Sequence, residues 1–216
     1  ASTEVATHMV ESLGDAGQVV VIAHDSKFLT SQERVNNFIA EIQNNHPNMS
    51  VAGPYYMDQI DDIKKTIAEQ QLDIVPVEGQ EFDEEQQTAL DDAIAQITDE
   101  DIYNYILEMN PDVKGIFATN GDTTMQALTA CEGKDMKDVV IMGYDADQEE
   151  IDAMKDGRIA GMIVQNPYGM GYATVVAEAR CALNMGNEAN VNTGYTWVTP
   201  DNIEDRTVQD ILYAEK

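Results

Sequence analysis

Four short apolar runs, each followed at once by a polar side chain, constrain this chain most strongly. The runs cover residues 18–23, 115–118, 139–143 and 161–164, and the polar residues after them are His24 and Asp25, Thr119 and Asn120, Tyr144 and Asp145, and Gln165. Their length and β-branched content predict buried strands. Helical patterns between them make the strands parallel. We therefore expect an α/β fold, an open and mostly parallel sheet with helices on both faces, whose ligands bind at the carboxyl ends of the strands.

The remaining periodicity predicts further helices and strands. Helices are expected over residues 3–12, 30–44, 58–71, 122–132, 147–155 and 167–185, with strands near 49–52 and 195–198 and a short terminal helix. Thr30 or Ser31 is the expected cap of the second helix, Asp58 that of the third, and Thr98 with Asp101 resembles a capping box.

An acidic stretch near 72–108 differs in composition from the rest. It contains the run 81–85 and then apolar residues at helical spacing, which predicts two acidic helices, the first as a surface insertion. A solvated face is the expected role of this charge, and a partner-binding face is the alternative.

Composition excludes several function classes. Forty acidic residues against 12 basic ones give a net charge of -28, which repels nucleic acid and anionic membranes. No apolar run reaches the length of a membrane span, and no export signal is visible at the first residues, which implies either its removal or a chain cut from something longer. Cys131 and Cys181 lack zinc-site spacing, so no metal and no cofactor are expected. An exported protein could join them in a disulfide, but two free, mostly buried thiols are the expectation.

The polar residues at the expected strand ends suit a neutral polyol. Asp25, Arg34, Asn120, Asp145 and Gln165 carry planar groups that can each hold two hydroxyls at once. The segment 55–57, which ends at Met57, and Tyr144 could add an apolar wall.

Each of these residues also has a purely structural alternative. Asp25 and Asp145 could cap the following helices, Asn120 could form a turn, and Arg34 could form a surface ion pair. Gln165 could be a loop residue, and Met57 and the tyrosines could belong to the core. Catalysis has little support because no phosphate-binding or nucleophile motif is present, and His24 with Asp25 is the one acid–base candidate.

Several segments together resemble the periplasmic sugar-binding proteins of the ribose/galactose type. Residues 110–120 are similar to their "hPDvkaIfa-N" segment, 139–145 to their "vvvvGfD" strand, and 157–171 to a "G-i-a-a-t-v-q-p...G" segment. Residues 31–38 resemble "s-a-x-R-x-x-G-F", with Asn37 in place of the usual glycine, and 199–203 resemble a C-terminal "vt-x-e-N".

The resemblance implies two α/β lobes joined by a three-segment hinge that close on a sugar. By matching motif, Arg34, Asn120, Asp145 and Gln165 fall on sugar-contacting positions, and Met57 and Tyr144 fall near the pocket wall. Met57 stands where an aromatic residue is common. Asp25 falls in a pocket-lining loop where an acid is less usual, so the ligand could differ.

The resemblance also implies a division of the chain. Residues 1–165 correspond to the second lobe, 166–197 to a segment that normally packs on the first lobe, and 198–216 to a crossing and a short helix. The helix after Pro167 would then lack its usual cover, and we expect self-association, domain swapping or folding back to replace it.

The first functional hypothesis is therefore the solute-binding component of an ABC-type sugar importer. It would be exported, lipid-anchored when complete, free of chemistry of its own, and partnered by a membrane permease that reads lobe closure. One alternative is the effector-binding domain of a sugar-responsive repressor, which needs a separate DNA-binding module. Another is a doubly wound sugar-modifying enzyme that uses His24 and Asp25.

Overall fold

A computed structural model describes residues 1–74, 82–188 and 190–212 of the chain. Within these ranges one six-stranded sheet has the order β2-β1-β3-β4-β5-β6, parallel except for β6, which runs antiparallel to β5. The strands are β1 (Gly17–Ala23), β2 (Met49–Tyr56), β3 (Val113–Ala118), β4 (Val140–Tyr144), β5 (Gly161–Gln165) and β6 (Tyr195–Val198). The predicted α/β class and parallel sheet are confirmed.

Helices cover both faces of the sheet because alternate residues of each strand point to opposite sides. Val19 and Val21 of β1 join one core with α1 (Ser2–Leu13) and α2 (Leu29–Asn45), where Phe38 stacks on Phe117 at a centroid distance of 4.3 Å. Val20 and Ile22 join a second core on the other face. That core is formed with α3 (Asp61–Gln71), α5 (Asp99–Met109), α6 (Gly121–Gly133) and α7 (Gln148–Lys155).

Two glycines allow close packing of the layers. A β-carbon at Gly143 in β4 would lie 2.2 Å from Thr124 Oγ1 of α6, and one at Gly161 in β5 would lie 2.1 Å from the Trp197 ring of β6. Neither position has room for a side chain, so glycine there lets α6 pack closely on β4 and the Trp197 ring lie over β5.

Some predicted helix caps are confirmed and others are wrong. Thr98 and Asp101 form the predicted capping box of α5, and Asp101 has a lowered pKa because it accepts hydrogen bonds from the Thr98 side chain and backbone. Helix α2 starts before Thr30 and Ser31, with Phe28 at its N-cap, because Asp25 already folds the preceding loop. Asp58 does not cap α3, whose N-cap is Ile60, because its carboxylate binds Ser26 instead.

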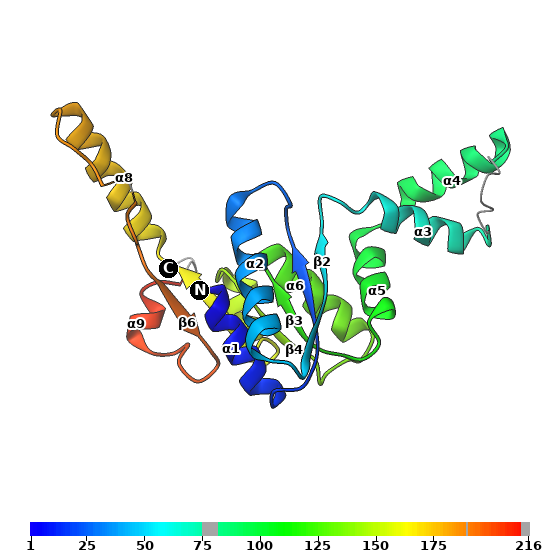
Figure 1. The fold of residues 1–216 in the computed structure, drawn as a ribbon, viewed down its shortest axis with the longest axis horizontal. Coiled ribbons are helices and arrows are strands. Elements are labelled where there is room, and N and C mark those ends of the chain that lie inside the picture. Colours follow the sequence, from blue (N-terminus) through cyan, green and yellow to red (C-terminus); the bar gives the residue numbers. More distant parts are fainter. Residues whose placement is uncertain (75–81, 189, 213–216) are drawn as a thin grey trace.

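The two acidic helices of the 72–108 stretch have different environments. Helix α4 (Glu84–Gln96) buries only Leu90 and projects with α3 away from the sheet (Figure 1). Helix α5 buries Ile102, Tyr103, Ile106 and Leu107 in the second core. The solvated helix is therefore α4, whereas α5 is part of the sheet cover. Part of the acidic run 81–85 lies outside the described residues.

Helix α8 (Pro167–Ala182) projects from the opposite end of the molecule and buries none of its residues (Figure 1). Its Tyr168 is 81% exposed, and Tyr172 and Val175 on the same helix are also exposed. Leu183, which follows the last residue of the helix, is exposed as well. The helix has not folded back on the sheet, so that part of the prediction is wrong. Cys181 is exposed for the same reason, whereas Cys131 in α6 is buried as predicted.

The last helix within the described residues is the short α9 (Arg206–Gln209), where a short terminal helix was predicted. Among the described residues, no helix combines the length and apolar character that crossing a membrane requires.

Candidate functional site

Most of the predicted site residues follow the carboxyl ends of β1, β3, β4 and β5, which lie at one edge of the sheet. Thr119 N donates to Ile22 O at 3.1 Å, and Asp145 N donates to Ile163 O at 3.0 Å, so the strand hydrogen bonding continues into the residues that follow. The polar groups at this edge consequently stand on a rigid backbone, which is what precise recognition of a small ligand requires.

Arg34 reaches this edge from α2 and is not a surface ion pair. Its Nη1 donates to Thr119 O, and its guanidinium carbon lies 3.9 Å from the centroid of the Tyr144 ring. Tyr144 is buried, and its hydroxyl bonds Ser2 Oγ at 2.8 Å. Burial raises the pKa of Tyr144, which keeps the phenol neutral. Arg34 is thus fixed between a backbone carbonyl and an aromatic face.

Asn120 and Asp145 flank the N-terminus of α6. Asn120 is the N-cap, and its Oδ1 accepts from Thr123 N at 3.2 Å. Asp145 has a left-handed backbone with φ of 78°, and its Oδ2 accepts from Gly121 N at 3.1 Å. Asp147, rather than Asp145, caps α7. The positive end of α6 thereby holds the Asp145 carboxylate beside the Asn120 amide.

Gln165 ends β5 and lies opposite Tyr195 of β6. It lines a cavity of about 530 Å³ together with Arg34 and Tyr144, and residues 191–195 form another wall of this cavity. Three of the predicted residues therefore share one cavity at the carboxyl edge.

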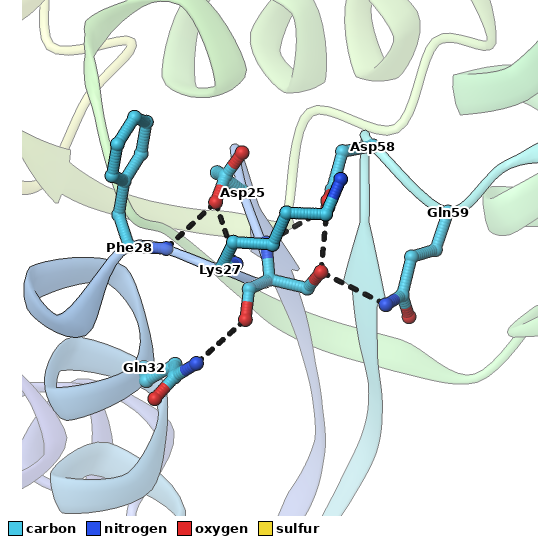
Figure 2. Close-up of polar contacts among 7 residues, drawn as sticks. Asp25, Lys27, Phe28, Gln32, Asp58 and Gln59 are labelled. Carbon is cyan, nitrogen blue, oxygen red and sulfur yellow. Dashed lines mark hydrogen bonds and ion pairs between the residues drawn. The ribbon is translucent and has the colours of Figure 1, made fainter.

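Asp25 and Met57 do not line that cavity, and neither do Asn120 and Asp145. Asp25 Oδ1 accepts from Lys27 N at 2.6 Å and from Phe28 N at 2.8 Å, which shapes the loop between β1 and α2 (Figure 2). Met57 is half-buried, packs against the second core and donates its N–H to Ala23 O at 2.9 Å. Asp25 therefore shapes the loop and does not cap α2, whose N-cap is Phe28, whereas Met57 packs against the core as its structural alternative predicted.

Sequence reasoning missed a polar network that joins the loops after β1 and β2 (Figure 2). Asp58 accepts from Ser26 N and Ser26 Oγ, both at 2.8 Å, and Gln59 Nε2 donates to Ser26 Oγ at 2.8 Å. Burial opposes ionisation of Asp58, but the Ser26 hydrogen bonds and Lys27 outweigh it and lower the pKa of Asp58. The sequence held one indication of this network, because Ser26 and Asp58 each lie two or three residues after a strand.

The acid–base pair proposed for an enzyme does not form. His24 Nδ1 lies 2.9 Å from Thr119 Oγ1, and the Asp25 carboxylate is bonded to its own loop. Burial and the nearby Arg34 lower the pKa of His24, which favours a neutral imidazole. Among the described residues, no group of three or more His, Cys, Asp or Glu side chains could hold a metal ion. The arrangement provides hydrogen-bonding groups without a recognisable catalytic set.

The fold is an open, mostly parallel α/β sheet, a class of fold that binds its ligands at the carboxyl ends of the strands. The family model described as a periplasmic binding protein domain matches residues 57–182, which is more than half of the chain. The chain belongs to this family of periplasmic binding proteins, as the sequence resemblance indicated.

Curated relatives cover a limited part of the chain. The chain is 35% identical over 66 residues to the ribose import binding protein RbsB of Salmonella typhimurium, which is 31% of this chain and 22% of that protein. It is 24% identical over 105 residues to RbsB of Bacillus subtilis, which is 49% of this chain and 30% of that protein.

Solved structures show the same fold over nearly the whole chain. An ABC transporter solute binding protein from Agrobacterium vitis with bound D-fucose has a TM-score of 0.73 at 22% identity, covering 98% of this chain and 61% of that one. A second one from Agrobacterium vitis, bound with alpha-D-tagatopyranose, has a TM-score of 0.74 at 20% identity, covering 99% and 60%. The chain therefore spans about three fifths of the length of these structures and matches less than a third of the length of the curated relatives.

Proposed function

We propose that this chain forms one wall of the sugar site of an ABC-importer solute-binding protein. The observation that carries the proposal is the arrangement of Arg34, Asn120, Asp145 and Gln165 at the carboxyl edge of a periplasmic-binding-protein sheet. Relatives named as ribose import binding proteins, and similar folds solved with D-fucose or tagatose, support a small neutral sugar as ligand.

The groups at this edge match the chemistry of a sugar. Adjacent hydroxyls each donate and accept a hydrogen bond, so a carboxylate such as Asp145 can accept from two of them. Arg34 supplies donors, while the amides of Asn120 and Gln165 supply a donor and an acceptor each. The binding step needs no bond making or breaking, and its output is a stabilised closed arrangement of lobes that a membrane permease reads.

The division into lobes is part of the same proposal. Residues 1–165 would form one lobe together with β6, which pairs with β5, so the expected boundary at residue 197 is moved back to before β6. Helix α8 would pack on a second lobe supplied by further polypeptide. Two observations support this arrangement. The apolar surface of α8 is exposed, and this chain covers only 61% of the solved structure with bound D-fucose. Self-association through α8 stays a prediction, and it competes with the second lobe for the same surface.

Location follows the family. Periplasmic binding proteins act outside the cytoplasm, and we place this protein there, with a lipid anchor as the finer proposal. No observation favours the repressor alternative, and the acid–base pair on which the enzyme alternative rested is not formed.

A thermal-shift screen against pentoses and hexoses tests the proposal. We expect one neutral sugar to raise the unfolding midpoint of the wild-type chain, since a ligand that binds only the folded state stabilises it. The shift should disappear in Asp145→Ala and persist in Asp138→Ala, an exposed carboxylate near the opposite end of β4. An equal loss of the shift in both variants would count against a site at the carboxyl edge.

A further inference from the structure

Glu150, in the first turn of α7, is a buried carboxyl group that the proposed binding mechanism does not use. Its exposed fraction is 0%. Its Oε2 accepts from Asp147 N at 3.1 Å in the capping box of α7, whereas Oε1 has no hydrogen-bond partner among the described residues. An ionised carboxylate in such a position would be strongly destabilised, because half of its charge lacks a donor.

The carboxyl group fits against the first residue of α6. A β-carbon built on Gly121 would lie 3.1 Å from Glu150 Oε2 and 3.3 Å from its Cδ, so the missing side chain of Gly121 makes the space that Glu150 fills. The same Gly121 donates its N–H to Asp145 Oδ2, and it follows the N-cap residue Asn120. Glu150 therefore packs against a residue that follows Asn120 in the chain and is hydrogen-bonded to Asp145, which comes from the end of β4.

The charged groups that face Glu150 are all acidic. Asp147 comes from its own helix cap, Asp145 from the end of β4, and Asp122 from α6. Burial is the main cause that raises the pKa of Glu150 to about 8, and these three carboxylates add to it, although the Asp147 backbone hydrogen bond acts in the opposite direction. At neutral pH the side chain is consequently a neutral carboxylic acid.

We propose that Glu150 is a positioning residue whose neutral carboxylic acid sets the separation between the N-termini of α6 and α7, and with it the separation of Asn120 from Asp145. This inference rests on the proposed function only for its effect on sugar. When Glu150 ionises, repulsion from Asp122, Asp145 and Asp147 and the demand of Oε1 for a donor favour parting of the two helix ends. The binding edge then loosens in alkaline solution.

The sign of the stability effect follows from proton linkage. The folded chain keeps the Glu150 proton to about pH 8, whereas the unfolded chain loses it near the ordinary value of 4.5. Between these values the folded state binds more protons, so the free energy of unfolding decreases as pH rises through this window and is constant above it. Glu150→Gln removes the dependence, because the amide stays neutral and its oxygen can still accept from Asp147 N.

The decisive experiment compares thermal unfolding of wild type, Glu150→Gln and the matched control Glu149→Gln, which changes the exposed neighbouring carboxylate. From about pH 5 to about pH 8, the unfolding midpoint of wild type should fall increasingly below that of Glu150→Gln and stay parallel to that of Glu149→Gln. The hydrogen-exchange protection of the Gly121 amide should drop above about pH 8 in wild type and not in Glu150→Gln. Parallel profiles for all three proteins would overturn the proposal.

A second pair of variants covers the case in which Glu150→Gln does not fold. Gly121→Ala should lower the unfolding midpoint, since its methyl group meets the Glu150 carboxyl group, and Glu150→Ala in the same chain should recover much of the loss. Additive losses would contradict the direct fit between the two residues.

Sugar titrations separate this inference from the proposed function. With D-ribose or the best sugar of the screen, wild-type affinity should fall several-fold above about pH 8 and that of Glu150→Gln should not. If neither protein binds any sugar at neutral pH, the proposed function fails while the unfolding comparison still decides the role of Glu150. Equal pH dependence of affinity in both proteins would overturn the positioning role.

Discussion

At the scale of single residues, the carboxyl edge is organised by Arg34. Its guanidinium donates to Thr119 O and lies over the Tyr144 ring, so one side chain links α2, the end of β3 and the end of β4. The planar group can do this while leaving other N–H donors for a ligand, which a lysine ammonium cannot, because it is a point charge with no plane to stack.

Replacement Arg34→Lys should therefore weaken both folding and binding. Loss of the stacked contact and of the ordered hydrogen bond should lower the free energy of unfolding by about 1 to 2 kcal/mol, as measured by urea denaturation. Arg158→Lys is the matched control, since Arg158 forms exposed ion pairs with Glu132 and Asp156 and should change stability little. Similar losses in both variants would contradict the role given to Arg34.

The sequence predicted which edge of the sheet several candidate residues occupy, because parallel strands bring their carboxyl ends to one edge. Asn120, Tyr144, Asp145 and Gln165 follow directly from that rule. The rule does not tell which aspartate caps α7, because Asp145 and Asp147 both precede that helix. In the structure Asp147 is the cap, and Asp145 accepts a hydrogen bond from Gly121 N. The buried position of Glu150 was also invisible, since a glutamate in the first turn of a helix is usually solvated.

At the scale of elements, the loops after β1 and β2 behave as one unit. Asp58 in the second loop accepts two hydrogen bonds from Ser26 in the first, and Lys27 Nζ lies 3.7 Å from Asp58 Oδ2 (Figure 2). The joined loops carry Phe28 and Leu29, which are 63% and 66% exposed beside the carboxyl edge. Asp58 thus fixes where two apolar side chains stand relative to the site.

Replacement Asp58→Ala should release the first loop. Amide exchange of Ser26 should accelerate at least several-fold, and sugar affinity should fall by a smaller factor, because the sheet itself is unchanged. Since the folded pKa of Asp58 is lowered, the wild-type protein should show the same release only in acid, as pH falls through that folded value. The matched control is Asp112→Ala, an exposed aspartate at the other end of the sheet. Unchanged exchange at Ser26 would show that the tie is unimportant.

Element positions were largely predictable, whereas their starts were less so. Strong apolar periodicity located the strands and helices, and Thr98 with Asp101 gave the start of α5. The starts of α2 and α3 were wrong, because the aspartates nearby bond to loop backbone and to Ser26, and tertiary contacts of this kind leave no local pattern.

At the scale of the whole molecule, α8 is the feature that a single sheet does not explain. Its apolar residues surround the helix, which predicted partners on more than one side, yet none of its residues is buried within this chain. At roughly 25 cal/mol per Å² of apolar surface, covering its exposed tyrosines and valines would contribute several kcal/mol. The sequence indicated the need for a cover but not its identity, because a surface pattern does not specify the partner.

Thiol labelling measures whether this surface is covered. In the native chain Cys181 on α8 should react rapidly with a thiol reagent. Cys131 should react only on unfolding, because it is buried, and burial with the neighbouring Glu132 raises the pKa of its thiol to about 11. Protection of Cys181 that increases with protein concentration would instead indicate self-association. Protection independent of concentration would contradict the exposed helix.

The most direct test of the central claim is to map sugar binding on the isotopically labelled chain by NMR. We predict that D-ribose or a similar neutral sugar, even at weak affinity, shifts the amide signals of Asn120, Asp145 and Gln165 and that Asp145→Ala abolishes the shifts. Shifts that cluster instead at the cavity of about 290 Å³ beside Cys131 and Arg158, near the start of β4, would contradict a sugar site at the carboxyl edge. The absence of any shift at saturating sugar would contradict it as well.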